Sequence, residues 1–180
     1  MRSVPVAGPI SPSVVAEAVA GDTLAFSRIV RAHHDDMVRV CQVIAGDPDI
    51  AQDATQAAWP IAWRRLSTLR EPAALRPWLI TIAANEARRM LRTERRAHTT
   101  ELASADVALI ELDPARRDPD LDLIASVRRL DPDDRRILAL RYVAGFDATE
   151  IGRAIGMSPS GVRSKLARAV ERLRREVDRG

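Results

Sequence analysis

The chain has 180 residues, of which 46% are hydrophobic, 29% are charged and only 3% are aromatic. This composition is typical of a soluble, helix-rich protein with one large or two small domains, and it excludes collagen-like and low-complexity proteins. Runs of β-branched and aromatic residues are scarce, so we expect an all-α rather than an all-β fold. The single cysteine, Cys41, excludes an internal disulfide and a cysteine-cluster zinc site, and it favours a reducing cytoplasm.

The charges are unevenly distributed along the chain, although the net charge is only +3. Residues 1–97 carry a net charge of +3, residues 98–122 carry −5, and residues 123–180 carry +5. Almost every cation is an arginine, and Lys165 is the only lysine. Guanidinium groups pair bidentately with phosphates and base edges, so this bias is compatible with nucleic-acid binding, although a GC-rich genome would produce it equally well.

We expect no secretory signal peptide at the N-terminus. No stretch approaches the ~18 uninterrupted apolar residues of a membrane-spanning helix, so we expect no membrane insertion. Prolines at positions 5, 9 and 12 interrupt the apolar run that a signal peptide needs. We therefore expect residues 1–12 to form a disordered tail.

Helical periodicity dominates the region that follows. Apolar residues recur every three or four positions in residues 22–45, which predicts an amphipathic helix that ends at Gly46. Its core stripe consists of Phe26, Val30, His33, Met37, Cys41 and Ile44. Asp47 and Pro48 predict the start of a second helix that continues to about Thr68, with a kink at Pro60. Residues 69–77 predict a loop between two prolines.

A third helix is predicted from about Pro77 to Arg96, and its last third is strongly basic. The five arginines there are Arg88, Arg89, Arg92, Arg95 and Arg96. Cations at a helix C-terminus interact favourably with the helix dipole, but five within nine residues exceed what capping requires. This helix end is therefore a candidate nucleic-acid surface.

Residues 98–122, which are acidic and lack an apolar period, predict a flexible, extended linker.

Residues 123–180 predict a second small helical domain. A short helix over residues 123–130 precedes one that is capped by Asp131, begins at Pro132 and continues to Val143. Asp147 and Glu150 match a capping box for a helix through Ile155.

The strongest local pattern is a short helix, a turn at Gly156 and then a long basic helix that begins at Ser158-Pro159. This is the layout of a helix-turn-helix, whose second helix enters the major groove of DNA. The core face of that helix is predicted to contain Val162, Leu166, Ala169, Leu173 and Val177, with Ile151 and Ile155 opposite. The outward face contains the candidate DNA ligands Ser160, Arg163, Ser164, Lys165 and Arg168. A helical hairpin with a solvated charged face is the alternative.

Two other groups of residues are candidate functional sites, one for binding a protein and one for binding a metal ion. Asp53, Gln56 and Trp63 recur at roughly helical spacing beside Trp59, and polar groups beside an aromatic are typical of protein-interface anchors. A buried tryptophan under a polar surface is an equally open interpretation. His33-His34-Asp35-Asp36 would suggest a metal-dependent phosphohydrolase, but adjacent helical residues point about 100° apart and cannot converge on one ion. We expect no metal or other cofactor.

Three segments together resemble bacterial RNA polymerase sigma factors of the extracytoplasmic-function (ECF) class, over roughly residues 20–176. The segment Asp53-Ala-Thr-Gln56-Ala-Ala-Trp59-Pro-Ile-Ala-Trp63 resembles the family's polymerase-binding helix. Trp78-Leu-Ile-Thr-Ile82-Ala-Ala-Asn85, followed by the arginine run, resembles the helix that reads the promoter −10 element. Residues 130–142, 150–156 and 162–169 resemble the domain that reads the −35 element.

The resemblance implies an all-α protein in which sigma domain 2 (residues 13–97) and sigma domain 4 (residues 123–180) flank the linker. It implies contacts from Asp53, Gln56, Trp59 and Trp63 to the β′ clamp helices of core RNA polymerase, with the β flap as a further partner. The loop 70–77 would capture a flipped −10 base, and Asn85 and the five arginines would hold the separated strand. The helix from Ser158 would read the −35 duplex.

By the same resemblance the chain is a cytoplasmic transcription factor that performs no chemical catalysis, and an anti-sigma factor is a possible regulator. Four positions depart from the family pattern. Ala57 replaces a commonly acidic residue, and Pro60 interrupts the polymerase-binding helix. Arg89 stands where aspartate is frequent, and Ala84 stands where a basic residue is common. These departures affect the polymerase surface and the −10 sequence preference. A stand-alone helix-turn-helix regulator is the main alternative.

Overall fold

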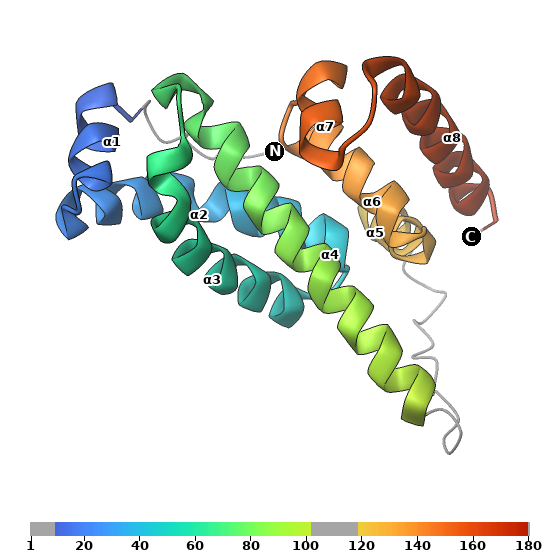
Figure 1. Ribbon diagram of the computed structural model, residues 1–180. Coiled ribbons are helices and arrows are strands. Elements are labelled where there is room, and N and C mark those ends of the chain that lie inside the picture. The colour runs from blue at the N-terminus through green and yellow to red at the C-terminus, as the bar shows by residue number, and fades with distance from the viewer. Residues whose placement is uncertain (1–9, 102–118, 180) are drawn as a thin grey trace.

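The computed structural model describes residues 10–101 and 119–179, with the side chains of 95–101 and 119–122 excepted. The described residues form helices and contain no strand (Figure 1). The first group, called the N-terminal domain below, comprises α1 (Pro12–Val19), α2 (Thr23–Ala45), α3 (Pro48–Arg65), the 3-10 turns Leu66–Thr68 and Pro72–Ala74, and α4 (Leu75–Glu101). The second group, called the C-terminal domain, comprises α5 (Pro119–Arg129), α6 (Pro132–Leu138), the π-helical turn Ala139–Val143, α7 (Ala148–Ile155) and α8 (Pro159–Val177).

Local signals define both ends of α2 and the start of α3, and the sequence predicts the end at Gly46 and the start at Asp47-Pro48, whereas α3 ends at Arg65 rather than near Thr68. The Asp22 carboxylate caps α2 by accepting hydrogen bonds from the amides of Leu24 (2.7 Å) and Ala25 (3.1 Å). Gly46 ends α2 in the left-handed conformation, with φ of 73°, which glycine adopts without a steric penalty. The Asp47 carboxylate then caps α3, with Pro48 at its first position.

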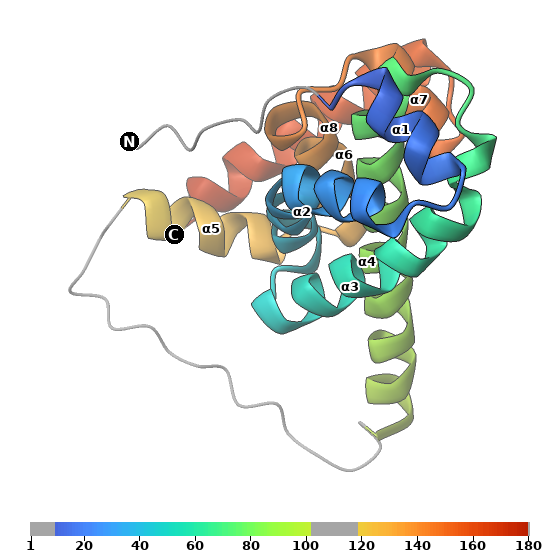
Figure 2. The ribbon, with the colours of Figure 1, turned by 90° about the vertical axis from the view of Figure 1, so that its left-hand side faces the viewer.

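The core of the N-terminal domain lies between α2, α3 and α4, which pack against one another, while α1 covers α2 (Figure 2). The inner faces of α3 and α4 consist largely of alanine, whose small side chains let the two helices approach closely. These alanines are Ala51, Ala54, Ala58, Ala62, Ala83, Ala84 and Ala87. The larger core side chains come mainly from α2 and α4 and include Ile29, Met37, Ile44, Leu79 and Ile80.

The C-terminal domain packs α8 against α5, α6 and α7. Its core contains Ile137, Leu140, Phe146, Ile151 and Val162, all buried. In both views the C-terminal half of α4 projects away from the helical bundle (Figures 1 and 2).

Several expectations need correction. Residues 12–19 form the helix α1, which was not predicted. Proline is tolerated in the first turn of a helix, so Pro12 does not prevent this helix from forming. The helix α4 begins at Leu75 rather than Pro77 and continues to Glu101, and α5 begins at Pro119 rather than residue 123. Val177, expected in the core, is 43% exposed. Most of the predicted tail and linker, residues 1–9 and 102–118, lies outside the described residues.

We expect His33 to make the stability of the N-terminal domain depend on pH. The side chain is buried in α2, and burial lowers its pKa, an effect that the charge of Arg76 reinforces and that of Asp36 opposes. The unfolded chain therefore binds a proton on this histidine at a higher pH than the folded chain does. The free energy of unfolding is expected to fall as the pH decreases from about 7.5 through the ordinary histidine pKa of about 6.5.

Chemical denaturation at a series of pH values checks this expectation. The variant His33→Gln, which cannot titrate, is expected to lose the part of the pH dependence that His33 contributes. Identical slopes for the two proteins between pH 7.5 and 5.5 would contradict the assignment.

Candidate nucleic-acid interface

The four candidate polymerase-binding residues of α3 differ in their exposure to solvent. Asp53 and Gln56 are exposed, whereas Trp59 is only 9% exposed. The Trp59 indole donates a hydrogen bond to Nδ1 of His34 (3.3 Å) and packs edge-on against Phe26. Trp63 is 36% exposed and its ring lies 4.7 Å from that of Phe26. The surface thus presents two polar side chains and one partly exposed tryptophan, Trp63, whereas Trp59 is buried.

The basic part of α4 forms the second candidate surface. Asn85, Arg88, Arg89, Arg92 and Thr93 line a shallow hollow of about 270 Å³. The side chains of Arg89 and Arg92 are exposed, and Arg89 pairs with Glu86 at 2.8 Å. Arg95 and Arg96 belong to α4, but their side chains lie outside the described residues. A concave surface of guanidinium and amide groups suits a phosphate backbone with accessible base edges.

Two residues of α6, which the sequence analysis did not single out as site residues, contact this hollow. Nε and Nη2 of Arg88 donate to the Asp133 carboxylate at 2.5 and 3.2 Å. Arg136 Nη2 donates to the side-chain oxygen of Asn85 at 2.5 Å. The hydrogen bonds from Arg88 lower the pKa of Asp133, and the charges of Arg88, Lys165 and Arg136 add to this effect against the opposing effect of burial. The sequence did not indicate this pairing, because a contact between residues 45 positions apart leaves no local signal.

The helix-turn-helix has the geometry that its capping residues predict. Asp147 and Glu150 form the reciprocal capping box of α7, and Gly156 ends that helix with φ of 74°. The amides of Gly156 and Met157 both donate to the carbonyl oxygen of Gly152, at 2.9 Å each. These bonds fix the turn, so that α8 leaves it in a defined direction.

The N-terminal half of α8 is the third candidate surface. The Ser158 hydroxyl caps the helix by accepting from the Gly161 amide at 3.2 Å. Lys165 is half-buried, and the remaining predicted ligands on this half are exposed: Ser160, Arg163, Ser164 and Arg168. Positions 160, 163, 164 and 168 are three or four residues apart, so they share one face of the helix. A major groove could accept this face directly.

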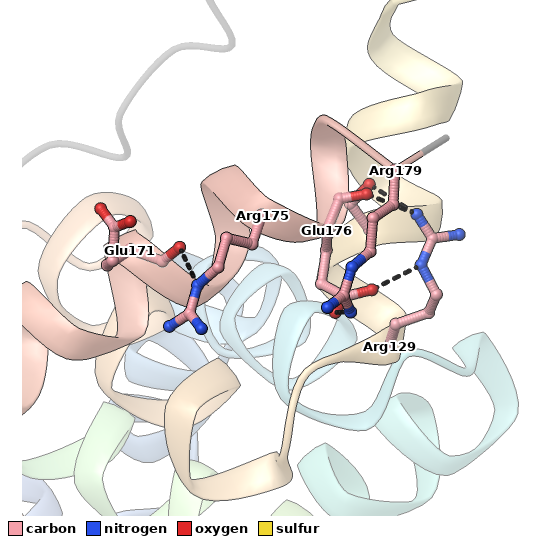
Figure 3. Close-up of polar contacts among 6 residues, drawn as sticks. Arg129, Glu171, Arg175, Glu176 and Arg179 are labelled. Atoms are coloured by element: carbon pink, nitrogen blue, oxygen red, sulfur yellow. Dashed lines mark hydrogen bonds and ion pairs between the residues drawn. The ribbon is translucent and has the colours of Figure 1, made fainter.

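The C-terminal half of α8 has a structural role instead. Arg129 of α5 donates to the Glu176 carboxylate at 3.1 Å and to its backbone oxygen at 3.0 Å, and Arg179 pairs with the same carboxylate (Figure 3). Arg172 pairs with the buried carboxylate of Asp134 on α6. These contacts hold the C-terminal half of α8 against α5 and α6.

The alternative metal site receives no geometric support. Among residues 10–94 and 123–179, no group of three or more histidine, cysteine, aspartate or glutamate side chains is placed to hold a metal ion. His34 accepts a hydrogen bond from Trp59, while His33 lies in the core. Over the described part of the chain, no helix combines the length and apolar character that crossing a membrane requires.

The sequence matches the family models of Sigma-70 region 2 over residues 29–97 and Sigma-70 region 4 over residues 120–173. The RNA polymerase sigma factor CarQ of Myxococcus xanthus is 32% identical over 127 residues, which cover 69% of this chain and 73% of CarQ. The ECF RNA polymerase sigma factor SigM of Mycobacterium tuberculosis is 28% identical, over 90% of this chain and 82% of SigM. A probable sigma factor, RfaY of Xanthomonas campestris pv. campestris, is 32% identical, but the match covers only 42% of RfaY.

Two solved structures share the fold. CnrH in complex with the cytosolic domain of CnrY aligns with a TM-score of 0.68 and 23% identity, over 94% of this chain and 97% of CnrH. The sigma factor RpoE in complex with the anti-sigma factor NepR, from Bartonella quintana, aligns with a TM-score of 0.68 and 19% identity, over 85% of this chain and 96% of RpoE. With the two matched regions in the order that the sequence predicts, the chain belongs to the sigma-70 family of RNA polymerase sigma factors, in the ECF class of these transcription initiation factors.

Proposed function

We propose that this chain binds core RNA polymerase through the outer face of α3 and directs initiation by holding promoter DNA at two separate places. The basic hollow of α4 binds the separated strand of the −10 element, and the first half of α8 reads the −35 duplex. The observation that carries the proposal is the presence of two cationic helical surfaces on different domains of one chain. The exposed polar groups Asp53 and Gln56 belong to α3, a different helix from the two that carry the DNA surfaces.

Each surface suits a different form of DNA. The α4 hollow combines Asn85 with three guanidinium groups, and such a groove can follow a single-stranded backbone while the amide reads a base edge. The turn Pro72–Ala74 comes directly before α4 in the chain, and residues 70–77 would receive a flipped base. The α8 surface is convex and helical, which suits the major groove of a duplex.

In this proposal the chain itself performs no bond-making chemistry, because nucleotide addition belongs to the polymerase. It acts in the cytoplasm, where it meets core polymerase at the β′ clamp helices and the β flap. An anti-sigma factor is a proposed regulator, since CnrH and RpoE were each solved with a partner chain, which for RpoE is named as an anti-sigma factor.

Run-off transcription tests the proposal. Core polymerase reconstituted with the purified chain is expected to initiate at discrete sites in a genomic promoter library, whereas core polymerase alone does not. If the chain instead binds duplex operators tightly without polymerase and directs no initiation, it is a stand-alone helix-turn-helix regulator.

Replacing Arg163 with alanine tests the role of α8 in this scheme. Arg163 is exposed near the N-terminus of the helix, the part that contacts base edges in a helix-turn-helix. If it reads a base, we expect a cost of about 1–3 kcal/mol on the preferred −35 sequence and a smaller cost on sequences altered at one position. A uniform loss across sequences would indicate a phosphate contact instead.

The matched control for this test is Arg174→Ala, which removes one exposed arginine from the other end of α8. Footprinting and titration of the polymerase complex provide the comparison. An unchanged footprint and affinity for Arg163→Ala would remove Arg163 from the site.

A further inference from the structure

An apolar groove of about 560 Å³ lies between the end of α2 and the helix α5. Its aliphatic lining comes from both domains and consists of Val43, Pro48, Leu123, Ile124, Val127 and Val143. Leu123, Ile124 and Val143 are 45%, 50% and 38% exposed, so the groove leaves large aliphatic side chains in contact with water. A hollow of this size can hold several side chains of an occupant, and covering its lining is favourable because apolar surface is removed from water.

The polar residues of the groove indicate the charge that an occupant carries. Arg39 and Arg128 line the groove together with Asp47. The Asp47 carboxylate is engaged as the cap of α3, and Arg39 pairs with Asp36, whereas the Arg128 side chain is exposed. An aliphatic segment with acidic residues beside it therefore complements the groove in both hydrophobicity and charge.

The chain itself contains a segment of this chemistry within residues 102–118, which lie outside the described residues. The run Val107-Ala-Leu109-Ile110-Glu-Leu112 has four large aliphatic side chains among six residues. Its acidic residues and those directly beside it are Asp106, Glu111 and Asp113. Elsewhere in residues 102–118 the only large aliphatic residue is Leu102, so the sequence selects residues 107–112 as the occupant.

The position of this run in the chain also favours the groove. Leu112 precedes Pro119, the first residue of α5, by seven positions, and seven extended residues span up to about 24 Å. Leu123 of the groove is one helical turn after Pro119. A segment tethered so closely has an effective concentration in the millimolar range, so even a weak intrinsic affinity keeps the groove occupied.

We propose that residues 107–112 of this chain bind in the groove between α2 and α5 when the chain is free, with Leu109 and Ile110 as the central apolar anchors. The segment then covers aliphatic surface that both domains contribute, and its acidic residues lie near Arg128. This inference concerns the free chain and does not depend on the proposed contacts with polymerase or promoter DNA.

Alkylation of a cysteine in the groove tests the proposal on the full chain. The variant Ile124→Cys places a thiol on the groove lining, while the native Cys41 is buried, which raises the pKa of its thiol to about 11 and makes it react slowly. Adding Leu109→Ser and Ile110→Ser is expected to raise the rate of alkylation of Ile124→Cys by iodoacetamide at least about fivefold, because the segment no longer shields the thiol. Circular dichroism establishes that each variant is folded.

The matched control adds Ala103→Ser and Ala105→Ser to Ile124→Cys, which introduces the same two hydroxyl groups outside the apolar run. This control is expected to react at the rate of Ile124→Cys alone. Equal rates with and without Leu109→Ser and Ile110→Ser would overturn the proposal. A rate that depends on protein concentration but not on these two substitutions would identify a second copy of the chain as the occupant and would overturn it equally.

Disulfide formation locates the segment independently. With oxidised glutathione, the double variant Ile110→Cys with Ile124→Cys is expected to form an intramolecular disulfide faster than Ala115→Cys with Ile124→Cys. Residue 115 is nearer to residue 124 in the chain, so tether length alone favours the second pair, whereas docking of residues 107–112 favours the first. Faster coupling of the second pair would contradict the docking.

Discussion

Replacing Asp53 and Gln56 together with alanine is expected to weaken association with core RNA polymerase at least tenfold. Both side chains are exposed on α3, so their loss removes hydrogen-bonding groups from the proposed interface without disturbing the core. A tenfold change corresponds to about 1.4 kcal/mol, which is a modest demand on two polar groups near the centre of a protein interface. Equilibrium titration of labelled polymerase measures the effect.

The double variant Asp35→Ala with Gln42→Ala is the control, because it removes the same two side-chain types from exposed positions of α2. It is expected to bind polymerase as the unmodified chain does. Both double variants are expected to retain their affinity for duplex −35 DNA, since α8 is unchanged. Equal polymerase affinities for the two double variants would contradict the assignment of α3 as the docking surface.

Replacing Gly152 with alanine is expected to destabilise the C-terminal domain and to abolish most −35 binding. A Cβ atom at this position would lie 2.5 Å from the carbonyl oxygen of Met157, a backbone atom that cannot rotate away. The turn would have to move, and the two hydrogen bonds that Gly156 and Met157 donate to the Gly152 carbonyl oxygen would move with it. We expect a cost of about 1–3 kcal/mol, reduced somewhat by the better helix propensity of alanine.

Gly161→Ala provides the matched control, because it makes the same substitution in α8. A Cβ atom there would meet the Ser158 hydroxyl at 3.2 Å and the terminal methyl of Met157 at 3.3 Å, and a flexible methionine can yield. Thermal unfolding is expected to show a clear loss for Gly152→Ala and a change of no more than about 0.5 kcal/mol for Gly161→Ala. Equal losses for the two variants would contradict the close approach at Gly152.

The features that the sequence predicted best are those that depend on neighbouring residues. The caps at Asp47, Asp131 and Asp147 and the left-handed ends at Gly46 and Gly156 all occur as expected. Each of them is a contact between residues two to four positions apart, so the pattern and the structure carry the same information.

Features that depend on distant residues were harder to predict. The indole of Trp59 is buried because Phe26 and His34 of α2 cover it, a contact that spacing within α3 cannot indicate. The helix α1 was not predicted because Pro5, Pro9 and Pro12 precede or begin it. Burial of Val15 and Ala18 stabilises this helix. The pairing of Arg88 with Asp133 joins residues 45 positions apart in the chain.

In the proposed function, two cationic helical surfaces, held to polymerase by α3, contact one promoter at a set interval. Run-off transcription from a promoter that the chain recognises, with the spacing between the −35 and −10 elements changed in single base-pair steps, is the decisive test. We predict a sharp optimum and a loss of initiation when five base pairs are added, since half a helical turn rotates one element to the opposite face of the DNA. Equal transcription at every spacing, or transcripts that do not require the chain, would contradict the claim.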